Sequence, residues 1–207
     1  DLRIPHQGTT ARVRVMRGVP GKVHTDQEVA EIPVRDGVLP ADPARDLSKV
    51  AVFYRHEPRA GATGTRGFGF VTGLGFQPHV AFGSTVAHDS HNLMVLGTDD
   101  DDMVLAANEL IRRGGGMVVV IAGRVRAAVP LPLAGLMSLE PADVVAGQVE
   151  ELEAALREAG CPAPHIEMTL SLLPLIVIPE LRLTNRATGL VELPPGEPPR
   201  FVELIVR

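Results

Sequence analysis

Two segments of this 207-residue chain have the periodicity of amphipathic helices with signals at both ends, and the other apolar runs are short. The first helix is predicted over residues 99–113. Four aspartates after Thr98 complement the positive end of the helix dipole, and Gly114 ends the helix. These aspartates lack the alternating ligands, central Gly and distal Glu of a calcium loop, so a helix cap is the favoured interpretation. The expected apolar stripe consists of Met103, Ala106, Ala107, Leu110 and Ile111.

The second helix is predicted over residues 141–159, with Pro141 in its first turn and Gly160 as its stop. One face of this helix is apolar because its large aliphatic residues are spaced by four, three and four positions. This face consists of Val145, Val149, Leu152 and Leu156. The residues expected to face water are Glu150, Glu151, Glu153 and Arg157.

The remaining apolar runs are typical of strands. They cover residues 11–16, 28–35, 50–54, 93–96, 117–121, 124–129, 170–178 and 181–183. A turn is expected at residues 18–21 and a loop at 58–67. Glycines at 67, 69, 73 and 75 indicate a strand and turn that another backbone approaches closely. Because repeated βαβ units are absent, we predict the α+β class, with a mixed β-sheet and two main helices.

The proline-rich stretch at residues 40–43 predicts a linker, and we expect a boundary near residue 46. Residues 1–45 would then form a β segment and linker, and residues 46–207 one compact α+β unit. The N-terminal strands should pack elsewhere, or only at the edge of this unit.

Composition excludes several classes of protein. A net charge of −5 and few aromatic residues argue against a nucleic-acid surface. The single cysteine, Cys161, excludes a disulfide framework and the zinc site of cytidine-type deaminases, and it indicates a reducing compartment such as the cytoplasm. No apolar run is long enough to span a membrane. Because the chain begins with Asp1 rather than Met, we expect it to be part of something longer.

The densest group of chemically capable side chains lies between residues 84 and 92, in the sequence Ser-Thr-Val-Ala-His-Asp-Ser-His-Asn. Buried polar groups are unfavourable unless paired, so this segment is either a solvated turn or a site. The cleft or substrate candidates are Ser84, His88, Asp89, His91 and Asn92. His88, Asp89 and His91 have a spacing that can bring imidazole and carboxylate onto one accessory metal. Arg55 and His56, at a strand end, are weaker candidates that alternatively pair with a neighbouring acid.

The segment from His88 to Asn92 resembles the C-terminal domain of bacterial and archaeal adenine deaminases, in the amidohydrolase superfamily. The resemblance spans about residues 46–193, and its other matching segments are 49–56, 69–75, 102–108, 114–120, 131–138, 168–171 and 177–184. The chain departs from the family at Thr72, where Lys is usual, and at Pro174.

This resemblance implies that residues 11–39 are the last strands of a β-sandwich that flanks a catalytic barrel. Adenine deaminases hydrolyse adenine to hypoxanthine and ammonia, a step in purine metabolism. Their barrel holds a divalent metal (manganese, iron or zinc) that activates water. The barrel ligands begin with an H-x-H motif, which none of the seven His of this chain forms, and the barrel itself needs roughly 200 residues or more.

We therefore expect the barrel to be absent from this chain and the chain alone to be inactive. Its expected partners are the catalytic barrel domain of the same enzyme and adenine, in a homo-oligomer, with no nucleic acid and no membrane. The alternative is a stand-alone binding or assembly module derived from that domain.

Overall fold

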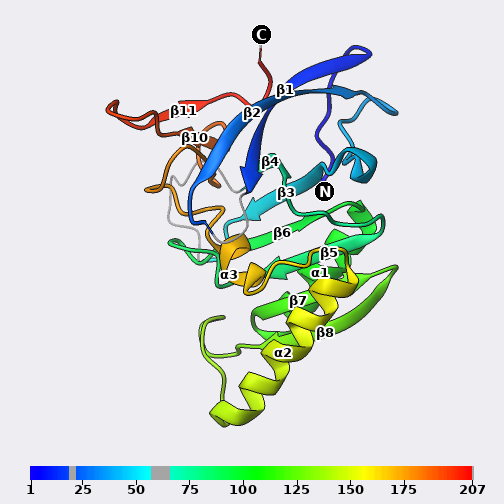
Figure 1. The fold of residues 1–207 in the computed structure, drawn as a ribbon, viewed down its shortest axis with the longest axis vertical. Coiled ribbons are helices and arrows are strands. Elements are labelled where there is room, and N and C mark those ends of the chain that lie inside the picture. Colours follow the sequence, from blue (N-terminus) through cyan, green and yellow to red (C-terminus); the bar gives the residue numbers. More distant parts are fainter. Residues whose placement is uncertain (19–21, 57–65, 207) are drawn as a thin grey trace.

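The computed structural model describes residues 1–18, 22–56 and 66–206, and within them eight strands form one sheet (Figure 1). The order across this sheet is β2-β1-β4-β3-β6-β5-β7-β8. Its strands are β1 (Thr10–Gly18), β2 (Thr25–Pro33), β3 (Ser48–Phe53), β4 (Arg66–Thr72), β5 (Val80–Ser84), β6 (Leu93–Gly97), β7 (Gly116–Ile121) and β8 (Arg124–Pro130). The helices are α1 (Asp100–Arg113), α2 (Ala142–Glu158) and α3 (Ile166–Ser171), with a 3-10 helix at Pro43–Arg45.

A smaller sheet has the order β11-β10-β9 and contains β9 (Leu181–Leu183), β10 (Leu190–Glu192) and β11 (Arg200–Val202). In the large sheet, β1 and β4 pair in parallel, and the other neighbouring strands pair antiparallel. The predicted α+β class and mixed sheet are therefore confirmed. The predicted turn at 18–21 and loop at 58–67 lie largely outside the described residues.

Helices cover both faces of the central strands, which explains why these strands are continuous apolar runs. Successive side chains of a strand point to opposite faces. In β6, Leu93 and Val95 pack in the same cluster as α1, whereas Met94 and Leu96 pack with residues of α2 and α3. Figure 1 shows α2 lying across the end of the sheet formed by β7 and β8.

The N-terminal strands lie at one edge of the same large sheet, one of the two placements expected for them. Val13, Val15 and Ile32 share a buried cluster with Leu47 and Phe70, so apolar packing crosses the predicted linker. The division into residues 1–45 and 46–207, and the β-sandwich origin of the first part, stay predictions.

Helix α1 begins as the acidic run predicts. The side chain of Asp99 accepts hydrogen bonds from the backbone N–H groups of Asp101 and Asp102, and Gly114 ends the helix at φ +79°. The apolar stripe predicted for this helix is wrong at one residue. Met103, Ala106 and Leu110 are buried, but Ile111 is 68% exposed because it lies at the solvent edge of the stripe.

Helix α2 packs on β8 and β7 through the face predicted for it. Leu152 and Leu156 are buried, and Val145 and Val149 are half-buried against the same cluster. One expectation is wrong here: Glu153 does not simply face water. Its carboxylate is half-buried, 2.9 Å from the Nδ1 atom of His165.

The strand predicted at residues 170–178 is wrong. Helix α3 ends at Ser171, and a series of turns follows up to β9. Ile166, Leu170 and Leu173 are buried with the spacing of four and three positions that one face of a helix requires. A short apolar run supports either interpretation, and here the tertiary packing selects the helix. None of the helices described is both long and apolar enough to cross a membrane.

Candidate functional site

The polar segment 84–92 connects β5 to β6, its antiparallel neighbour in the sheet. Ser84, at the end of β5, is completely buried, and its hydroxyl accepts a hydrogen bond from the N–H of Val86 at 3.0 Å. It therefore shapes the turn and does not line a surface of this chain.

The two histidines of the segment lie beside each other. The rings of His88 and His91 have centroids 5.5 Å apart and meet edge to face, and both residues are half-buried. The backbone holds them there: the N–H of His88 donates to the carbonyl of Ser171 and that of His91 to the carbonyl of Ala87, both at 2.8 Å. Asp89 is exposed. The structure thus presents two adjacent imidazoles on a turn held by backbone hydrogen bonds.

Asn92 links this turn to a distant part of the chain. It is 1% exposed, and its amide group donates to the hydroxyl of Ser90 and to the Oδ1 atom of Asn185, both at 3.0 Å. Asn185 lies in the connection between β9 and β10. A buried amide of this kind fixes the relative position of the two loops.

Arg55 and His56, which follow β3, hold the segment from the other side. Arg55 donates to the carbonyls of His91 and Ala134, and its burial lowers the pKa of its guanidinium. His56 lies with Nε2 2.9 Å from the carbonyl oxygen of Ser90. Within the described residues, these two side chains therefore contact backbone carbonyls, those of His91 and Ser90 in the polar segment and that of Ala134 outside it, rather than an acid.

A cleft of about 330 Å³ opens beside the polar segment. It is lined by Asp89, Ser90, Pro174, Leu175, Ile176, Val177, Thr184, Asn185 and Arg186. The wall at residues 174–177 is apolar, and Val177 is 72% exposed. Close backbone approach is confirmed at Gly67, because a Cβ atom there would overlap the carbonyl of Thr184. The cleft thus combines an apolar wall with hydrogen-bonding groups.

The apolar wall is fixed by a buried arginine. Arg182 is 1% exposed and donates to the carbonyls of Leu172, Ile178 and Pro179 and of Val23, at 2.6–3.0 Å. Burial lowers the pKa of its guanidinium to about 10. Among the described residues, the dipoles of backbone carbonyls rather than a carboxylate therefore stabilise this charge.

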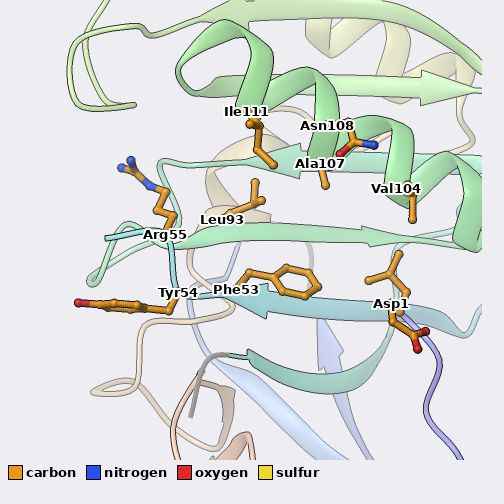
Figure 2. A pocket seen from close by; sticks show the side chains of 10 residues that line it. Asp1, Phe53, Tyr54, Arg55, Leu93, Val104, Ala107, Asn108 and Ile111 are labelled. Carbon is orange, nitrogen blue, oxygen red and sulfur yellow. The ribbon is translucent and has the colours of Figure 1, made fainter. Parts of the chain in front are cut away.

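A second pocket, of about 500 Å³, lies between α1 and the strands β3 and β6. Figure 2 shows Phe53 and Leu93 on the strands facing Ala107 and Ile111 on the helix, with Arg55 at one end of the pocket. Its lining is mostly apolar. Arg55 therefore contacts the polar segment and also borders this separate pocket.

Two groups of possible metal ligands are close enough to share an ion in the part of the chain that the structure describes. They are His79, Asp99 and Asp102, and Glu153, His165 and Glu167. Neither group contains a residue of segment 84–92, so the accessory metal at His88, Asp89 and His91 stays a prediction. Cys161 is buried, and burial raises the pKa of its thiol.

Comparison with known proteins places the chain in a family. The profile described as "Adenine deaminase C-terminal domain" matches residues 22–194. A protein named adenine deaminase from Rubrobacter xylanophilus is 49% identical over 193 residues, which is 93% of this chain and 31% of that protein. Proteins of the same name from Moorella thermoacetica (47% identical, 92% of this chain) and Paracoccus denitrificans (42%, 93%) match similarly. The chain spans about a third of the length of these relatives. It belongs to the adenine deaminase C-terminal domain family.

Proposed function

We propose that this chain acts as the C-terminal domain of a metal-dependent adenine deaminase, and that segment 84–92 and its cleft face the catalytic domain. The reaction is hydrolysis of adenine to hypoxanthine and ammonia. The observation that carries the proposal is the pair of adjacent imidazoles of His88 and His91, with ring centroids 5.5 Å apart, in the turn whose Asp89 and Ser90 line a cleft, in a chain of this family.

The contribution of this chain is positioning and exclusion of water. A neutral imidazole offers one donor and one acceptor. Nδ1 of His91 lies 3.2 Å from the carbonyl oxygen of Val86, so Nε2 of His91 and the imidazole of His88 are the groups that can hydrogen-bond a partner domain or the polar edge of a purine. Three side chains hold the turn that carries them, Arg55, His56 and Asn92, through contacts to its backbone or hydroxyl groups. The apolar wall at residues 174–177 supplies area for a partner to cover.

The divalent metal of the reaction belongs to the catalytic domain. When bound there, it supplies a hydroxide nucleophile near neutral pH. The residues of this chain do not fit that metal site, since its seven His include no H-x-H pair. A cytoplasmic location is part of the proposal and is supported by the unpaired thiol of Cys161.

A chimera tests the proposal. The matching 193-residue segment of the Rubrobacter xylanophilus protein is replaced by this chain, and adenine consumption is followed by absorbance. We expect turnover in the chimera. His88→Ala and His91→Ala should each lower it by roughly 10–100-fold, because misplacement near the chemistry has effects of that size.

The matched control is His6→Ala, which removes another half-buried imidazole, outside this site. It should leave turnover unchanged. A folded chimera that is inactive with adenine, or one in which all three variants behave alike, would contradict the proposal.

A further inference from the structure

The residue before β5 and the start of α1 meet at one end of the large sheet, away from segment 84–92. His79 precedes β5, Asp99 caps α1, and Asp102 lies in the first turn of that helix. The Nδ1 atom of His79 is 3.0 Å from Oδ2 of Asp99. One ligand atom from each of the three residues lies within 4.8 Å of the others.

Asp102 is the unusual member of this group. It is 4% exposed, and its Oδ1 atom accepts a hydrogen bond from the N–H of Gly123, in the turn between β7 and β8, at 2.7 Å. Its Oδ2 atom is also buried but has no hydrogen-bond partner among the described residues. A buried carboxylate oxygen without a donor is strongly unfavourable, so this atom requires a proton, a donating water molecule or a cation.

The surroundings favour a cation. Residues 99–102 are all aspartates, and of these Asp100 is paired with Lys49 at 2.6 Å. No ion pair between Lys or Arg and the other three is found within the described residues. The positive end of the α1 dipole opposes a cation there, but it amounts to only about half an elementary charge. The negative charge of the three remaining carboxylates exceeds this positive partial charge.

We propose that His79, Asp99 and Asp102 form a binding site for a divalent first-row metal ion. The ligands are Nδ1 of His79 and Oδ2 of Asp99 and of Asp102. A set of one nitrogen and two oxygens suits Zn²⁺ or Mn²⁺ better than Ca²⁺ or Mg²⁺, which take all-oxygen sites. Water completes the coordination shell.

The second oxygen of each aspartate supports the site. Oδ1 of Asp99 accepts from the N–H groups of Asp101 and Asp102, and Oδ1 of Asp102 accepts from Gly123. Such contacts orient ligands before an ion binds. A bound ion would join the start of β5 to α1, whose first turn already holds the β7–β8 turn. The site is independent of the proposed deaminase function and of the metal in the catalytic domain.

The test uses the 207-residue chain after treatment with a chelator. Mn²⁺ binding is followed by electron paramagnetic resonance, and Zn²⁺ binding by competition with a chromogenic chelator. We expect about one equivalent of each, with Zn²⁺ bound more tightly, and no competition from Mg²⁺ at the same concentration. Asp102→Asn keeps the acceptor for Gly123 and should weaken binding at least about tenfold.

The matched control is Asp101→Asn, which removes an exposed charge from the same run and should change affinity by no more than about twofold. His79→Ala serves as a second variant, since the side chain of His79 is 67% exposed and its loss leaves the core intact. It should weaken binding as Asp102→Asn does. Unchanged affinity in both variants, loss of the ion in His88→Ala and His91→Ala instead, or no binding to the folded wild-type chain would each overturn the proposal.

Discussion

Replacement of Arg182 by Met tests how the apolar wall of the cleft is held. Methionine preserves much of the length of the side chain but removes every donor. The carbonyls of Leu172, Ile178, Pro179 and Val23 then each lose the hydrogen bond from Arg182. Those of Leu172 and Pro179 still accept from the backbone N–H groups of Leu175 and Thr25. At about 1 kcal/mol each, these four bonds contribute about 4 kcal/mol in total. Removal of a buried charge offsets part of that loss, so we expect destabilisation of about 2–3 kcal/mol.

Urea unfolding followed by circular dichroism at neutral pH measures this difference. A loss of about 2–3 kcal/mol shifts the midpoint by roughly 1–2 M for a typical dependence on urea. The control is Arg186→Met, an exposed arginine close to Arg182 in sequence, which should change stability by less than about 0.5 kcal/mol. If the Arg182 variant is equally mild, the guanidinium does not hold the turn and our account of the cleft is wrong.

Three further predictions concern α2, α1 and the isolated chain. Leu152→Ala should destabilise the fold by roughly 2–5 kcal/mol because Leu152 is fully buried. Replacement of the exposed Glu151 by Ala should change stability by less than about 0.5 kcal/mol. Equal effects of the two variants in denaturant melts would mean that α2 is not docked on the sheet. Hydrogen bonds from Arg112 lower the pKa of Glu109 from 4.5 to about 2, so the ionised carboxylate stabilises the fold above pH 4.5 and this contribution disappears as the pH falls toward 2. Glu109→Gln should therefore be less stable than wild type at pH 7 and similar to it near pH 2. A stability difference that does not change with pH would show that the interaction of ionised Glu109 with Arg112 does not stabilise the fold. The purified chain with added manganese or iron should not deaminate adenine, and turnover that persists through repurification would contradict this.

Local signals predicted α1 well because its determinants are close in sequence. The aspartate run, the stripe through Met103 and Leu110, and Gly114 all act within one helix. The adjacency of His88 and His91 is local in the same way, since residues three positions apart meet in a tight turn. Both features could be predicted because they depend only on residues close in sequence.

Long-range contacts could not be predicted from local patterns. Asn92 meets Asn185, and Arg182 reaches Val23, through tertiary packing that no sequence period encodes. Arg182 lies between two leucines of a strand, where alternation favours exposure, yet the turns from residue 172 to 179 bury it. The same packing converted the run around Leu170 from a predicted strand into α3.

Hydrogen exchange in the chimera with the Rubrobacter xylanophilus protein tests the central claim most directly, namely that the cleft faces the catalytic domain. Backbone amides of residues 84–92 and 172–189 are compared between the chimera and the free chain. We predict slower exchange of these amides in the chimera, with no change at the β1–β2 edge. Equal rates in both segments, with new protection elsewhere on the domain, would contradict the account.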